Sequence, residues 1–150
     1  MDEKSKMPFP QANDFIKIIM LVNIEDEEYL KDNNYLKNYL SLTTDRQISY
    51  YLSACEFLGL IDRKRHFTDD GKNIKELAHD LQILNLSRKI VSLPVFGEVF
   101  FMKYVYNSDF SKNDISDLIS TIYEIDNVSV CDRRASTVIS WLNWIEEQRK

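Results

Sequence analysis

Residues 33–68 narrow the possible folds of this chain more than any other stretch, because they predict two helices separated by a tight turn. The first helix carries a short apolar stripe and stops at the turn SLTT, residues 41–44. Thr44 stands three residues before Gln47, which is the spacing of a capping box, where each side chain bonds a backbone N–H group at the start of a helix. A second helix is therefore expected to begin near Asp45.

This second helix, at about 45–58, combines an apolar face with a polar one. Its apolar residues recur at helical spacing, and Gly59 suits the left-handed position that ends a helix. The opposite face offers a guanidinium, hydroxyls and a phenol, which can read base edges in the major groove of DNA. The residues expected to contact DNA from this helix are Thr44, Arg46, Gln47, Ser49, Tyr50 and Ser53.

Residues 60–68 predict a small β-hairpin with a basic tip. The motif LGLI, a basic turn and FTDDGK resembles the wing of winged helix-turn-helix domains, where a threonine and a glycine follow the returning strand. In such an arrangement Arg63, Lys64 and Arg65 would hold phosphates or enter the adjacent minor groove. A solvated turn is the other interpretation of these charges.

The net charge of −5 counts against nucleic-acid binding by the chain as a whole, because phosphate contacts supply most non-specific affinity. Its distribution is uneven, since residues 43–66 carry four basic against three acidic side chains, whereas the rest of the chain is net acidic. The only basic segment therefore coincides with the predicted recognition helix and hairpin.

Composition and motifs predict a soluble, cytoplasmic protein without a membrane span, since 44% of residues are hydrophobic, 29% are charged and no long apolar run occurs. Cys55 and Cys131 have no partner at metal-ligand spacing, so we expect both to be reduced core residues. Neither histidine belongs to a zinc or nuclease pattern. We predict no metal site, no cofactor and no catalytic residue in this chain.

Helices are also expected on both sides of the central stretch. Asn13 can cap a helix at 15–22, and Thr68 can cap one that runs to about residue 84. Ser87 can cap a short helix that ends near Pro94. Residues 95–106 predict a central helix shared by the two halves, with a strand pair as the alternative, and residues 1–11 a flexible or extended lead-in.

The last forty residues repeat the organisation of the first half. Ser111 and Asp114 predict one helix start, and Ser129 predicts the start of a second recognition helix at about 130–147. The DNA contacts expected from this helix are Arg133, Arg134, Ser136, Thr137 and Ser140. An ordinary surface helix is the alternative.

The stretch VCDRRASTVISWLNWI resembles the second winged helix of a tandem pair, and FPQANDF and TTDRQISYYLSACEFLGLI resemble the same group. That pair is the DNA-recognition part of certain type II restriction endonucleases and related defence proteins. The chain departs from the pattern at Lys150, where it ends directly after the second recognition helix. The second wing is therefore missing, or a further segment such as a nuclease domain follows.

Together these patterns predict a mainly α fold with a small β-hairpin wing, built from two winged-helix-like modules at residues 1–84 and 85–150 and joined by central helices. The predicted function is a double-stranded DNA-binding module, the sequence-recognition region of a restriction endonuclease or a related defence protein. A transcriptional regulator acting as a homodimer is one alternative. The other is a protein-protein interaction module anchored by Tyr50, Trp141 and Trp144.

Overall fold

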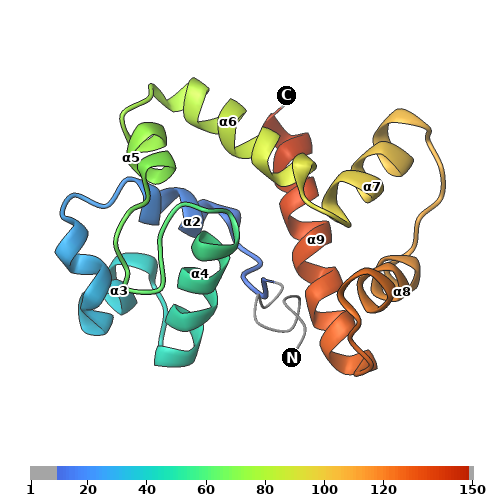
Figure 1. The fold of residues 1–150 in the computed structure, drawn as a ribbon, viewed down its shortest axis with the longest axis horizontal. Coiled ribbons are helices and arrows are strands. Elements are labelled where there is room, and N and C mark those ends of the chain that lie inside the picture. Colours follow the sequence, from blue (N-terminus) through green and yellow to red (C-terminus); the bar gives the residue numbers. More distant parts are fainter. Residues whose placement is uncertain (1–9, 149–150) are drawn as a thin grey trace.

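The computed structural model describes residues 10–148, which form two helical lobes joined by a connecting helix (Figure 1). The first lobe contains α2 (Phe15–Val22), the 3-10 helix η1 (Glu27–Lys31), α3 (Asn33–Leu40), α4 (Asp45–Phe57) and α5 (Asp69–Lys75). Helix α6 (His79–Ser92) crosses to the second lobe, which contains α7 (Phe96–Phe100), the π-helical turn η2 (Phe101–Val105), α8 (Lys112–Tyr123) and α9 (Val128–Gln148). Most of the predicted lead-in, residues 1–9, lies outside the described residues.

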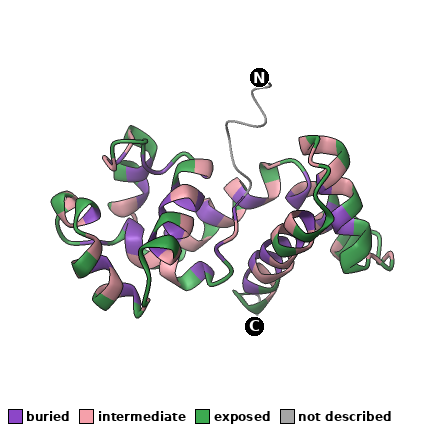
Figure 2. Cartoon of the chain, turned by 90° about the horizontal axis from the view of Figure 1, so that it is seen from below, coloured by how far each residue is buried: buried purple, intermediate pink, exposed green. Residues whose placement is uncertain are grey.

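Buried residues lie inside both lobes and at the junction between them, whereas exposed residues follow the outer turns (Figure 2). The predicted boundary between residues 84 and 85 falls inside α6, the helix that links the lobes. Among residues 10–148, no helix combines the length and the apolar character that crossing a bilayer requires.

The turn between α3 and α4 follows the sequence prediction closely. The Thr44 hydroxyl accepts the N–H of Gln47 at 3.1 Å, and the Gln47 side-chain oxygen accepts the N–H of Thr44 at 3.2 Å. This confirms the predicted capping box, which satisfies two backbone donors at the start of α4. At the other end, Gly59 takes the expected left-handed conformation, with φ of 75°.

The predicted β-hairpin wing is wrong, because residues 10–148 contain no β-strand. Ile61 and Phe67 form only an isolated antiparallel bridge. The Asp62 carboxylate accepts the N–H groups of Lys64 and His66 and so closes a tight loop between Ile61 and Phe67. Thr68 already caps α5 by accepting the N–H of Gly71 at 3.0 Å, so the chain turns into a helix before a strand can form. The fold is helical throughout its described part.

The predicted helix from Thr68 to residue 84 is interrupted, because α5 ends at Lys75 and α6 begins at His79. The Gln82 side chain donates to the carbonyl oxygens of Ile74 and Lys75, which end α5, at 3.0 and 3.2 Å. Gln82 is therefore buried, while Leu81 stays 48% exposed. The expected cap Ser87 instead lies inside α6.

The second lobe is built around the long helix α9, which packs along α8 (Figure 1). Ser111 and Asp114 form the predicted capping box at the start of α8. Helix α9 starts earlier than predicted, at Val128, and the Asn127 side chain rather than that of Ser129 accepts an N–H group of its first turn, that of Val130, at 3.1 Å. Residues 96–105 are helical and not a strand pair. They belong to the second lobe, however, and the helix between the lobes is α6 (Figure 1).

An aromatic cluster around Trp141 of α9 joins the two lobes. The Trp141 side chain is fully buried between the rings of Phe15 and Phe96, each with its ring centre 5.1 Å from that of Trp141. Its indole N–H donates to the carbonyl oxygen of Ala12 at 2.6 Å. One turn earlier, the Thr137 hydroxyl donates to the Asn13 side-chain oxygen at 2.7 Å. These contacts fix α9 against the N-terminal segment and therefore against the first lobe.

Candidate nucleic-acid interface

A cavity of about 240 Å³ lies between the N-terminal parts of α4 and α9. Both helices begin at the same edge of the molecule, the lower edge in Figure 1. We call this cavity the α4–α9 cleft; it is lined by Gln11, Asn13, Arg46, Tyr50, Arg133 and Ser136. Four of these residues, Arg46, Tyr50, Arg133 and Ser136, are sequence-predicted DNA contacts. The fold thus brings the two predicted recognition helices to one place.

The lining of the α4–α9 cleft contains two arginines and no carboxylate. The Arg46 Nε–H donates to the Tyr50 hydroxyl at 2.6 Å, and the guanidinium carbon lies 5.5 Å from the centre of the Tyr50 ring. Both contacts hold the exposed Arg46 side chain against α4. Within residues 10–148, neither Arg46 nor Arg133 forms an ion pair with an acidic side chain.

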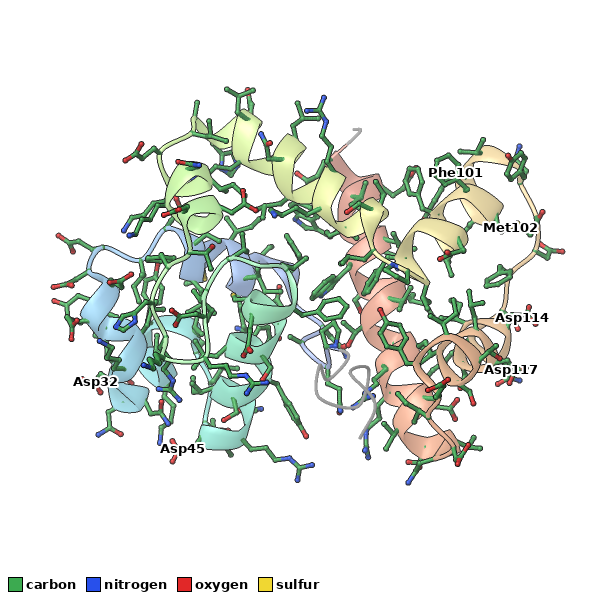
Figure 3. The ribbon with its side chains drawn as sticks, in the orientation of Figure 1. Asp32, Asp45, Phe101, Met102, Asp114 and Asp117 are labelled. Atoms are coloured by element: carbon green, nitrogen blue, oxygen red, sulfur yellow. The ribbon has the colours of Figure 1, made fainter. Side chains whose placement is uncertain are left out.

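The nearest acid in sequence to Arg46 is engaged elsewhere. The Asp45 carboxylate pairs with the ammonium of Lys37 at 3.0 Å, at the lower end of α4 in Figure 3. The hydrogen bond from Lys37 and the positive charge of that group hold the pKa of Asp45 below its ordinary value. The positive charge of Arg46 is therefore available to a ligand in the cleft.

Three of the residues predicted on α9, Arg134, Thr137 and Ser140, do not line the cleft. Thr137 is fully buried and bonded to Asn13, so the prediction that it contacts DNA is wrong. Arg134 is partly buried, its Nε has no hydrogen-bond partner among the described residues, and burial lowers the pKa of its guanidinium. Ser140 lines a separate cavity of about 250 Å³ that also contains Asp14 and Glu147. Repulsion from these carboxylates disfavours a phosphate beside Ser140.

The remaining predicted residues of α4 lie beside the loop that follows it. Ser49, Ser53, Arg63 and Arg65 line a cavity of about 150 Å³ together with Glu56 and Asp62. Thr44 and Gln47 are both used in the helix cap. Ser49 and Tyr50 are neighbours in sequence but line different cavities.

The three basic residues of the loop differ in how freely they can bind a ligand. Arg65 donates to the Asn33 side chain at 2.8 Å and to the Leu30 carbonyl at 3.2 Å, so its guanidinium is held by the first lobe. Arg63 pairs with Glu56 at 3.4 Å, but its side chain is 76% exposed. Lys64 is exposed. Arg63 and Lys64 are therefore better placed than Arg65 to reach a phosphate.

Gln11 and Asn13 are cleft residues that the sequence did not predict as ligand contacts. Asn13 was expected to cap α2, but the Asp14 carboxylate takes that role by accepting the N–H of Ile16. Asn13 instead binds Thr137 on α9. No local pattern signals this contact, because it depends on the packing of the two lobes.

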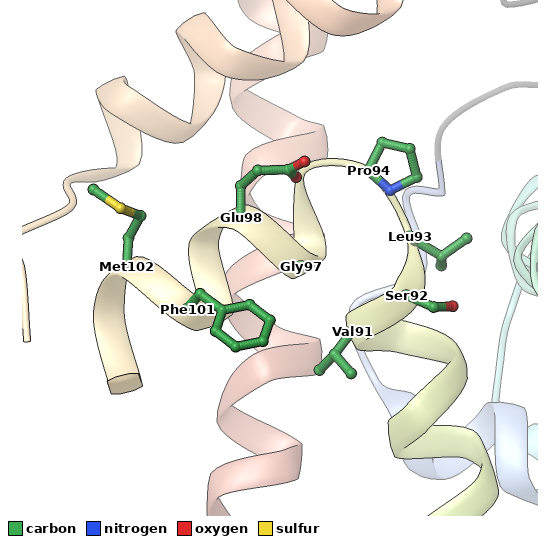
Figure 4. A pocket seen from close by; sticks show the side chains of 8 residues that line it. All are labelled: Val91, Ser92, Leu93, Pro94, Gly97, Glu98, Phe101 and Met102. Atoms are coloured by element: carbon green, nitrogen blue, oxygen red, sulfur yellow. The ribbon is translucent and has the colours of Figure 1, made fainter. Parts of the chain in front are cut away.

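A larger cavity of about 480 Å³ lies between the end of α6 and α7 (Figure 4). Its lining is mostly apolar and includes Leu93, Pro94, Phe101 and Met102, while the carboxylate of Glu98 accepts the N–H of Val95. Phe101 and Met102 lie on the second lobe far from Asp45 (Figure 3). This cavity lacks basic residues and therefore offers no site for an anion.

The tryptophans, the acidic and metal-ligating residues, and the cysteines bear on other activities. Trp141 and Trp144, the predicted anchors of a protein-interaction surface, are 0% and 7% exposed, so they cannot serve as such anchors. No group of three or more His, Cys, Asp or Glu side chains within residues 10–148 could hold a metal ion. Both cysteines are buried and free, and burial raises the pKa of the Cys55 thiol to about 12.

Comparison with known proteins gives a family but no function. No curated protein and no solved structure matches the chain. A family described as a domain of unknown function, DUF7226, matches residues 17–150, which include α3, α4, the basic loop and α9. On this match, which covers nearly the whole sequence, the chain belongs to the DUF7226 family.

Proposed function

We propose that this chain is a cytoplasmic, double-stranded DNA-binding module that holds the duplex against the α4–α9 cleft. One observation carries the proposal: Arg46 and Tyr50 from α4 meet Arg133 and Ser136 from α9 around one cavity without a carboxylate in its lining. The sequence predicted these residues as DNA contacts from two separate stretches, and their convergence supports a common ligand.

Electrostatics favour this surface over the rest of the molecule. A chain of net charge −5 repels a polyanion at most of its surface, so binding requires a site whose lining contains cations and no carboxylate. Arginine is suited to this task, because its fork of N–H donors binds phosphate oxygens and the O6 and N7 atoms of guanine. The exposed Arg63 and Lys64, in the loop after α4, are further cations of the first lobe.

Within this class we propose the sequence-recognition region of a restriction endonuclease or a related defence protein. The resemblance of the α4 and α9 stretches to such regions supports this choice over a transcriptional regulator. A regulator that acts as a homodimer reads near-palindromic sites, because its two-fold symmetry is matched by the DNA. A recognition region that acts alone reads sites without such symmetry.

The test is a fluorescence-anisotropy titration of the chain with a randomised duplex pool at low and moderate salt, followed by sequencing of the bound fraction. We expect binding that weakens with salt, with a log–log slope between about −2 and −4, since two to four basic side chains meet phosphates. We also expect an enriched motif without a palindrome. Absence of binding at low salt, or a slope of zero, would contradict the proposal.

A further inference from the structure

We infer that the α4–α9 cleft is one phosphate site, in which Arg46 and Arg133 bind the same phosphate group of the DNA backbone. This inference rests on the proposed function and makes it more specific. In a pair of independent DNA-reading modules, the two helices would contact separate phosphates. The inference instead gives α4 and α9 one shared phosphate.

The hydrogen-bonding groups of the cleft favour an anion. The side-chain oxygen of Asn13 already accepts from Thr137, which leaves the amide N–H groups of Asn13 as donors. The Tyr50 hydroxyl accepts from Arg46, so its own O–H remains as a donor. The Ser136 hydroxyl donates to the Asp132 carbonyl oxygen at 3.2 Å, so the donors offered to an anion come from the two guanidinium groups, Asn13 and Tyr50.

The two arginines have a physical reason to share one ligand. Both guanidinium groups carry a permanent positive charge, and both line one cavity of about 240 Å³ without a carboxylate between them. Like charges that converge on one cavity repel each other, and an anion between them removes that repulsion. The Arg46 Nε–H is bound to Tyr50, so the remaining four N–H donors of the Arg46 guanidinium are free for the phosphate oxygens.

The position of α9 at the cleft is also fixed before a ligand binds. The bonds from Trp141 to Ala12 and from Thr137 to Asn13 hold α9 against the segment that lines the cleft. Binding a phosphate therefore requires no movement of one lobe relative to the other, which lowers the entropic cost of the contact.

A double-mutant cycle on the full chain tests the inference. Arg46→Ala, Arg133→Ala and the double variant are titrated with the best duplex from the selected pool over a range of salt concentrations. We expect each single variant to bind roughly tenfold more weakly. The double variant should bind at least threefold more tightly than the product of the two single effects predicts, because both variants lose one shared contact.

The salt dependence gives an independent readout. The slope is that of log affinity against log salt concentration. If one phosphate is shared, the slope of the double variant is shallower than that of the wild type by about 1, whereas two separate phosphates make it shallower by about 2. Arg63→Ala is the matched control, and its effect should multiply with that of Arg46→Ala. If the losses of affinity from Arg46→Ala and Arg133→Ala multiplied, and the salt slope changed by about 2, the shared site would be overturned. The DNA-binding function would remain intact. A wild-type chain that binds no duplex would instead contradict both.

Inorganic phosphate separates the site from general charge screening. Sodium phosphate, compared with sodium chloride at equal ionic strength, should weaken duplex binding by the wild type more than by the double variant, because it competes for the cleft. Equal weakening of both proteins would contradict a phosphate site in the α4–α9 cleft.

Discussion

Replacing Arg46 and Arg133 together by glutamate is expected to weaken duplex binding by about a hundredfold or more. Hydrogen bonds to charged groups contribute about 1.5 to 3 kcal/mol each, and every 1.4 kcal/mol is about a tenfold change in affinity. The new carboxylates also repel the phosphates. Fluorescence anisotropy at low salt measures the change directly.

The matched control replaces Lys72 and Arg88 by glutamate. Both are exposed, and they lie on α5 and α6, away from the lower edge at which α4 and α9 begin (Figure 1). The control makes the same change in net charge, so it reports the effect of overall charge alone. We expect it to weaken binding by less than about tenfold. Equal losses in the two variants would mean that net charge, and not the α4–α9 cleft, governs binding.

Replacing Trp141 by alanine is expected to lower the free energy of unfolding by about 3 to 5 kcal/mol, since it removes a large buried side chain and leaves a cavity. The change also removes the hydrogen bond to Ala12 and the ring contacts with Phe15 and Phe96. Urea denaturation followed by circular dichroism gives the free energy. The milder Trp141→Phe keeps an aromatic ring but loses the N–H donor, so its loss should be smaller.

Phe101→Ala is the control for this experiment. Phe101 is also a large aromatic residue, but it is 49% exposed on η2. We expect a change below about 1 kcal/mol, because little apolar surface is returned to water. If Trp141→Ala changed the stability no more than Phe101→Ala does, the Trp141 cluster would not be the junction that sets the position of α9.

The sequence was most informative where local chemistry alone determines the structure. Thr44 and Gln47 are three residues apart and bond each other's backbone, so the start of α4 could be predicted within one residue. Ser111 and Asp114 do the same for α8. The polar faces of the helices were also recognisable, and this led to Arg46, Tyr50, Arg133 and Ser136.

The predictions were wrong where competing contacts outweigh the local pattern. The predicted hairpin is reduced to the single bridge between Ile61 and Phe67, because the next residue, Thr68, already caps α5. The prediction of one continuous helix from Thr68 to residue 84 was wrong because Gln82, a polar residue, is buried and bonds the carbonyl groups at the end of α5. Periodicity of apolar residues cannot reveal a buried glutamine whose partners come from tertiary packing.

The cleft itself could be predicted only in part. Four of its residues lie on recognisable helix faces, but their meeting depends on Trp141, Phe15 and Phe96. Thr137 has the same sequence setting as Ser136, yet it points to Asn13 and is buried. One position along a helix turns a side chain by about 100°, so the choice between neighbours requires the packing of both lobes.

The most direct measurement of DNA binding at the α4–α9 cleft is a two-dimensional ¹H–¹⁵N NMR spectrum of the chain with and without the selected duplex, including the arginine Nε–H signals. We expect the largest shifts at Arg46, at Arg133 and at the backbone amides of the first turns of α4 and α9. Shifts concentrated at Phe101 and Met102, or none on adding duplex, would contradict the account.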